Sequence, residues 1–110
     1  MIFMWNHWNV DHIGDHGVMP QEAEEIVRRM TPPFPRDIGH GKLLVWGQTR
    51  HGRYLQVVYV NQPDEKVDFE SLRPEDLLAY EDGDDILYVI HAMPMTDRQK
   101  GQYRRARGTR

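Results

Sequence analysis

The stretch KLLVWGQTRHGRYLQVVYV (42–60) decides the fold. Its two halves, 42–49 and 53–60, are rich in β-branched and aromatic residues, which favour strands. The Arg-His-Gly segment between them (50–52) has the length of a tight hairpin turn. The sequence therefore predicts two antiparallel strands, around which the rest of the chain must pack.

A third strand is expected at ILYVIHA (86–92), and a short one at IFMW (2–5). The segment 86–92 is apolar at nearly every position, which is typical of a strand in the centre of a sheet. Strict alternation along it would place His91 on the same face as Val89 and Leu87.

Two helices are expected near the N-terminus. WNVDHIGDHGV (8–18) has Asn9 as a candidate N-cap and Gly17 as the left-handed residue after its end. MPQEAEEIVRRM (19–30) has Pro20 at its first helical position, acidic residues early and arginines late. Both ends of each helix are therefore marked by the sequence.

The remaining segments divide into loops and one further helix. The run 31–41 has three prolines and two glycines, so a loop is predicted there. PEDLLAY (74–80) predicts a helical turn. The segment 96–107 predicts a C-terminal helix, because Thr96 and Gln99 have the spacing of a capping box.

This order predicts one α+β domain over residues 1–110. The expected domain is a small antiparallel sheet of three main strands and a short N-terminal one, with two N-terminal helices and a C-terminal helix. The chain has no cysteine, so a disulfide framework and a thiolate metal site are excluded. We expect no signal peptide and no membrane span, which favours a cytoplasmic protein.

Charge is distributed unevenly behind a net charge of −3. Residues 97–110 contain six Lys/Arg and one Asp, a net of +5, whereas residues 61–85 contain ten Asp/Glu and two Lys/Arg, a net of −8. A basic end commonly binds phosphates. The acidic insert 61–85 could instead fold over the basic helix and compete with RNA as an internal brake.

Four segments in this order resemble the BrnT family of toxins. They are the His-Gly-Val step at 16–18, EAEEIV at 22–27, GQTRHGRYLQVVY at 47–59 and VIHAMPMTDRQKGQYRR at 89–105. The resemblance covers most of the chain and is interrupted by the acidic insert. It departs from the family at Met93, where an Arg is usual, and at His91, where Ser is frequent.

The resemblance implies a RelE-like fold and a toxin of a type II toxin–antitoxin system. The implied activity is that of a metal-independent endoribonuclease with no cofactor. The implied partners are RNA as substrate and a protein antitoxin of the BrnA, ribbon-helix-helix kind, with operator DNA bound only by the complex. The alternative is a non-catalytic module of the same fold that binds a protein partner or nucleic acid.

Cleavage of RNA at its 2′-hydroxyl needs a base, an acid and cations that stabilise the phosphorane. His91 and His51 are candidate proton-transfer residues, because the pKa of histidine lies near neutrality. Arg53 is the candidate cation for the phosphate, since its guanidinium matches two oxygens. For His91 a neutral side chain bonded at a strand end, and for the hairpin a solvated polar turn, are the structural alternatives.

Candidate RNA-binding residues lie in the hairpin and in the C-terminal helix. Arg50 is at the hairpin tip. Lys100, Arg104 and Arg107 are spaced i, i+4 and i+7, so they share one helix face and can contact an RNA backbone. The structural alternative is a solvated tail, since Gly101 weakens the helix.

A metal site is not predicted. His12 and His16 have the i, i+4 spacing that can bind a metal ion. No cysteine and no HExxH pattern accompanies them, and His16 also suits the C-terminal end of its helix.

Overall fold

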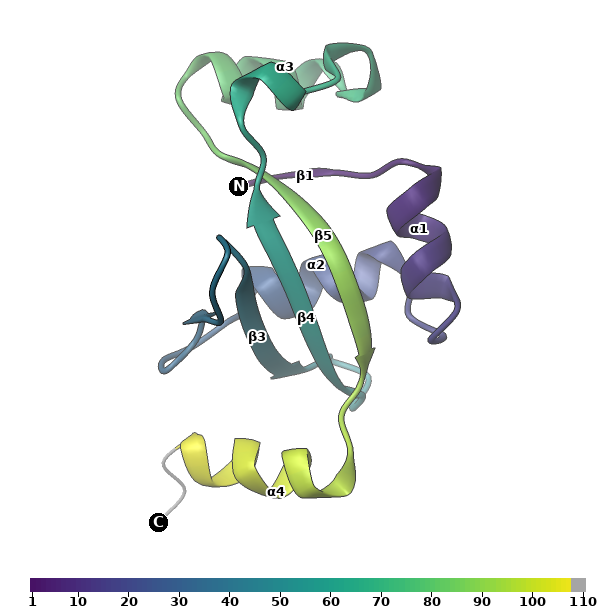
Figure 1. Cartoon of the computed structure of the whole chain (residues 1–110), viewed down its shortest axis with the longest axis vertical. Coiled ribbons are helices and arrows are strands. Elements are labelled where there is room, and N and C mark those ends of the chain that lie inside the picture. The colour runs from purple at the N-terminus through teal and green to yellow at the C-terminus, as the bar shows by residue number, and fades with distance from the viewer. Residues whose placement is uncertain (108–110) are drawn as a thin grey trace.

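The computed structural model describes residues 1–107 and has a five-stranded sheet flanked by helices (Figure 1). This α+β architecture confirms the predicted fold class. Arg110, one of the cations counted above, lies outside the described residues. In spatial order the strands are β1 (Ile2–Met4), β5 (Ile86–Pro94), β4 (Tyr54–Asn61), β3 (Leu43–Gln48) and β2 (Arg36–Asp37).

The prediction of a purely antiparallel, four-stranded sheet was wrong in two respects. β1 pairs with β5 in parallel, with Ile2 opposite Ile86, so the sheet is mixed. β2 is an additional short strand inside the expected loop 31–41, with Arg36 opposite Leu44. The chain reverses between β2 and β3 through residues 39–41, which all have positive φ. The prediction of a loop over 31–41 did not include this turn or the short strand before it.

The described helices are α1 (His7–Gly14), α2 (Pro20–Arg28), α3 (Pro74–Glu81) and α4 (Asp97–Ala106). The N-cap of α1 is Asn6, so the prediction of Asn9 as the N-cap was wrong. The Asn6 side chain accepts the backbone N–H groups of Trp8 and Asn9, and Asn9 Oδ1 accepts the N–H of Asn6. Asn9 therefore supplies the other half of a reciprocal capping box, and its amide also donates to the Met4 carbonyl.

Other predicted helix ends are confirmed. Gly17 has φ +73°, and the N–H of Val18 donates to the carbonyl of Ile13, which closes the end of α1. Pro20 is at the start of α2. In α4, Thr96 Oγ1 accepts from the N–H of Gln99 while the Gln99 side chain accepts from the N–H of Thr96. None of the described helices is long and apolar enough to cross a membrane.

The main core lies between α2 and one face of the sheet. α2 contributes Ala23, Ile26 and Val27, and the facing strands contribute their alternate apolar residues. The fully buried side chains from the strands and α1 are Ile13, Val45, Leu55, Val57 and Val89. The opposite face of the sheet is not covered by α2. On that face, α4 packs only across one end of the sheet (Figure 1).

A β-bulge in β5 changes which face His91 occupies. Val57 pairs with Ala92 and Tyr59 pairs with Val89, so these residues all face the core. His91 pairs with the half-buried Val58, on the opposite face, because the register shifts between Val58 and Tyr59. The predicted placement of His91 beside Val89 was therefore wrong. An extra residue in the bulge reverses the alternation.

The acidic segment 61–85 lies at the end of the sheet remote from α4 (Figure 1). Its helix α3, in the region predicted as a helical turn, belongs to a second apolar cluster formed with Ile2, Met4 and Ile86. The acidic segment therefore packs on β1 and does not cover the basic helix. The idea of an internal brake is not supported by this arrangement.

Candidate nucleic-acid interface

The C-terminal helix is held against the sheet by an aromatic cluster. Tyr103 is 5% exposed, and its ring centroid lies 6.3 Å from that of Phe34 and 6.1 Å from that of Tyr54. Phe34 also contacts Trp46. A buried tyrosine of this size contributes a large apolar area. The helix is therefore docked on the sheet, and the structural alternative of a solvated tail is wrong for it.

The three predicted RNA-binding cations at the C-terminus, Lys100, Arg104 and Arg107, lie against rings of this cluster. The Lys100 ammonium is 5.7 Å and the Arg104 guanidinium 5.1 Å from the centroid of Tyr54. The Arg107 guanidinium is 5.6 Å from the centroid of Tyr103, and its Nη1 donates to the Tyr103 hydroxyl over 2.9 Å. Cation–π contacts of this kind restrain long side chains. Arg104 Nη2 also donates to the Tyr54 hydroxyl over 3.5 Å. The predicted grouping of these cations on one side of the helix is thus found in the structure.

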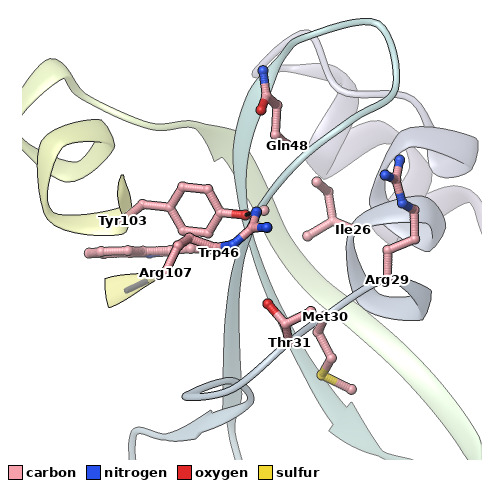
Figure 2. Close-up of a pocket in the computed structure, with 9 residues that line it drawn as sticks. Ile26, Arg29, Met30, Thr31, Trp46, Gln48, Tyr103 and Arg107 are labelled. Carbon is pink, nitrogen blue, oxygen red and sulfur yellow. Dashed lines mark hydrogen bonds between the residues drawn. The ribbon is translucent and has the colours of Figure 1, made fainter. Parts of the chain in front are cut away.

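A pocket of about 140 Å³ opens beside Arg107, along the edge of β3 that β2 leaves uncovered (Figure 2). Tyr103 and Arg107 enter it from α4, and Ile26 and Arg29 enter it from α2 (Figure 2). Trp46 Nε1 is buried at this pocket and has no hydrogen-bond partner among the described residues. Arg29 Nη1 already donates to Glu25 Oε2 over 2.7 Å, so the Arg107 guanidinium is the cationic donor that the pocket offers to an anionic oxygen.

His91 lies on the same face of the sheet as α4. Gln56 is paired with Trp46 and Met93 on that face, and its side chain bonds to Gln99 of α4 over 3.1 Å. His91 lies two residues before Met93 on β5, and its Nε2 is 3.1 Å from the Met93 sulfur. A ligand that runs from α4 across this face would therefore pass Met93 and reach His91.

His91 also lies near His12 of α1 and His16 of the turn after it, at the edge of β5 that β1 leaves unpaired. β1 pairs with β5 only as far as Tyr88, and α1 covers the edge beyond that point (Figure 1). His12 Nε2 is 3.3 Å from His91 Nδ1, and the His16 ring centroid is 5.2 Å from that of His91. The prediction of no metal site rested on the absence of a cysteine and of an HExxH pattern beside His12 and His16, and on the suitability of His16 for a helix end. His91 supplies a third imidazole.

The pKa of His91 is lowered from its ordinary value of 6.5. The largest cause is burial, which removes water from the charged ring, and the neighbouring His16 and His12 add to it. The side chain is therefore neutral at pH 7, with one ring nitrogen carrying a lone pair. A neutral imidazole can accept a proton or bind a metal ion.

Arg53 does not join His91 on that face. Its guanidinium Nη1 is 2.7 Å from Glu22 Oε1 and 3.0 Å from the Gly17 carbonyl, on the α2 side of the sheet. Burial raises the pKa of Glu22, but hydrogen bonds from Met19 and Arg53 together with the charge of Arg53 lower it overall. Arg53 therefore ties the start of β4 to the α1–α2 turn.

The hairpin residues Arg50 and His51 lie among carboxylates. The Arg50 N–H donates to Glu25 Oε2 over 2.6 Å, and this bond is the largest cause of the lowered pKa of Glu25. Both side chains border a shallow hollow with Glu22 and Glu25. The glutamates of this hollow are matched by an equal number of arginines, so the hairpin side carries less net positive charge than α4 and is a poorer RNA contact. The predicted site residues thus fall into two groups on different sides of the sheet.

Sequence reasoning missed the pocket at Trp46 and the third histidine of the cluster. His12 and His91 are 79 residues apart in sequence and no periodic pattern connects them. Comparison with protein families, with curated proteins and with solved structures finds no match for this chain. The resemblance to BrnT toxins stays a prediction.

Proposed function

We propose that this chain is an RNA-binding toxin of a type II toxin–antitoxin system, and that it cleaves RNA without a metal ion. The observation that carries the proposal is that His91 and the cationic helix α4 share one face of the sheet. A single RNA strand on this face would contact the cations of α4 at one end and the imidazole at the other. The cellular setting would be the cytoplasm, where RNA and the antitoxin are found.

RNA affinity would come from the α4 cations and from the pocket beside them. Lys100, Arg104 and Arg107 would each neutralise a backbone phosphate and release counterions. The pocket beside Trp46 would admit one phosphate oxygen, which would accept a hydrogen bond from the Arg107 guanidinium. Tyr54, half-buried beneath two cations, would add an aromatic surface for a base.

Cleavage would use the nucleophile that RNA carries. The 2′-oxygen would attack the adjacent phosphorus as a base removes the 2′ proton. The bond from phosphorus to the 5′-oxygen would break as an acid protonates the leaving oxygen, which gives a 2′,3′-cyclic phosphate and a free 5′-hydroxyl. Within this face, His91 is the candidate proton-transfer residue. Arg53 and His51 lie on other surfaces of the molecule. They are therefore only secondary candidates for the cleavage chemistry.

The proposal includes an antitoxin of the ribbon-helix-helix kind that would cover the same face. Operator DNA would be bound only through that complex. A neighbouring gene for a small protein of this type would support the assignment. The test is inducible expression in a bacterial host of wild type, of His91→Ala and of a matched control, His7→Ala. We expect growth arrest by wild type and by His7→Ala, and normal growth with His91→Ala.

A non-catalytic binding module is the second candidate, and one observation favours it. Met93 lies beside His91, at the position where the resembled family usually has an Arg, and Arg53 is engaged with Glu22. No cation is therefore seen in contact with His91 among the described residues. RNA binding by the purified chain without any cleavage, and without growth arrest, would favour this candidate over the toxin.

A further inference from the structure

We propose that His12, His16 and His91 together bind one divalent transition-metal ion, with Zn²⁺ as the best match. His12 comes from the last turn of α1, His16 from the turn that follows the helix, and His91 from the bulged part of β5. The ion would therefore join the helix to the open edge of the sheet. This inference stands without the proposed function, because its readout is metal binding and not RNA cleavage. With an ion on Nδ1 and Nε2 on the Met93 sulfur, His91 has no nitrogen free for proton transfer, so the proposed cleavage belongs to the metal-free chain.

The donor atoms are already close to a metal-binding geometry. One nitrogen from each of the three rings lies within 4.8 Å of the others. In a tetrahedral zinc site with Zn–N bonds of about 2.0–2.1 Å, two nitrogen ligands are roughly 3.3–3.4 Å apart. His12 Nε2 and His91 Nδ1, at 3.3 Å, already have this separation. His16 has to approach, which a rotation about its side-chain torsions can achieve.

The turn that closes α1 explains why His12 and His16 lie side by side. The N–H of His16 donates to the carbonyl of Ile13, so the chain curls back past the end of the helix and keeps the His16 ring near that of His12. The rings of His12 and His16 have centroids 5.9 Å apart, and each also faces His91, at 5.5 Å and 5.2 Å. The three rings thus surround one point and are not a linear stack.

The chemistry of the donors selects the class of metal. Imidazole nitrogen suits Zn²⁺, Cu²⁺, Ni²⁺ and Co²⁺, whereas Mg²⁺ and Ca²⁺ require oxygen ligands. No carboxylate belongs to the cluster as it is described for residues 1–107. Three protein ligands leave a fourth tetrahedral position for water, which is the pattern of an accessible zinc site and not of a closed one.

The surroundings of His91 are compatible with a metal ligand. If Nδ1 holds the metal ion, Nε2 keeps its proton and points toward the Met93 sulfur, 3.1 Å away. Thioether sulfur is a weak hydrogen-bond acceptor. This contact fixes the ring orientation, as the partners of metal-binding histidines usually do.

The test is a titration of the full chain, made without a polyhistidine tag, with Co²⁺ and with Zn²⁺. Visible absorption of Co²⁺ reports tetrahedral nitrogen coordination, and calorimetry with Zn²⁺ gives stoichiometry and affinity. The variants are His12→Ala, His16→Ala and His91→Gln. The control is His7→Ala, which removes an exposed histidine from the first turn of the same helix and outside the cluster. Circular dichroism of each variant establishes that it is folded.

We expect one ion per chain and an absorption band typical of tetrahedral Co²⁺. Loss of a group that merely hydrogen-bonds a ligand costs about 10–100-fold in metal affinity, so each of the three variants should lose at least about 100-fold. His7→Ala should bind as wild type does. Wild-type binding by any two of the three folded variants, or octahedral Co²⁺ spectra for the wild type, would overturn the proposal.

Discussion

Removal of the cations at Lys100, Arg104 and Arg107 should reduce the salt dependence of RNA binding. The perturbation is the triple variant Lys100→Gln, Arg104→Gln and Arg107→Gln. Glutamine has nearly the helix propensity of lysine and arginine, so the helix should persist. The buried Tyr103 ring, which anchors α4, is unchanged.

The magnitude follows from the number of cations. For a single strand, each neutralised phosphate contributes about 0.7 to the slope of log K against log salt concentration. Three lost contacts should therefore reduce the slope by about 2, and a tenfold change in salt should alter the wild-type advantage by about 100-fold. The assay is fluorescence anisotropy of a labelled single-stranded RNA over a series of KCl concentrations.

A second triple variant separates a local effect from a general one. Lys42→Gln, Lys66→Gln and Arg73→Gln remove three exposed cations outside α4. Each triple variant changes the net charge by three, from −3 to −6. We expect the control to keep nearly the wild-type slope. Equal slopes for the two triple variants would refute the assignment of the RNA contacts to α4.

The remaining predictions concern stability. Leu55→Ala should lower the free energy of unfolding by about 2–5 kcal/mol in urea, because Leu55 is fully buried between the sheet and α2. Gly47→Ala should also lower the free energy of unfolding, since the new Cβ would lie 3.1 Å from Ile26 Cδ1. Adding Ile26→Val should recover part of the lost stability. Additive effects of the two changes on the free energy of unfolding would contradict this contact. In EDTA, stability should fall as the pH drops below 6.5, because the lowered pKa of His91 means that the unfolded chain takes up the proton more readily. His91→Gln should flatten that part of the pH profile, and an unchanged profile would contradict the assignment.

The elements that could be predicted from the sequence were those with local signals. α2 has Pro20 at its start and a charge gradient along it, α4 has the Thr96–Gln99 box, and the hairpin has a three-residue turn between two β-rich runs. Each of these signals depends on residues a few positions apart. The α1 cap could have been found as well, because Asn6 and Asn9 have the capping-box spacing with Asn in both places.

The features that could not be predicted depend on contacts distant in sequence. The bulge that turns His91 away from the core is set by pairing between β4 and β5, and nothing in 86–92 marks it. The engagement of Arg53 by Glu22 joins residues 31 positions apart. The histidine cluster was not predicted for the same reason, because His91 is distant in sequence from His12 and His16. The candidate chemistry was therefore assigned to residues that the fold separates, while the C-terminal helix itself was predicted correctly.

The most direct test of the proposed nuclease is incubation of the purified chain with a labelled RNA in EDTA, beside a strand of the same sequence with 2′-O-methyl groups throughout. The account predicts cleavage of the unmodified RNA alone, with 2′,3′-cyclic phosphate ends, and loss of cleavage in folded His91→Ala but not in His7→Ala. Intact RNA under conditions in which the chain binds it, or equal cleavage by His91→Ala, would contradict the account.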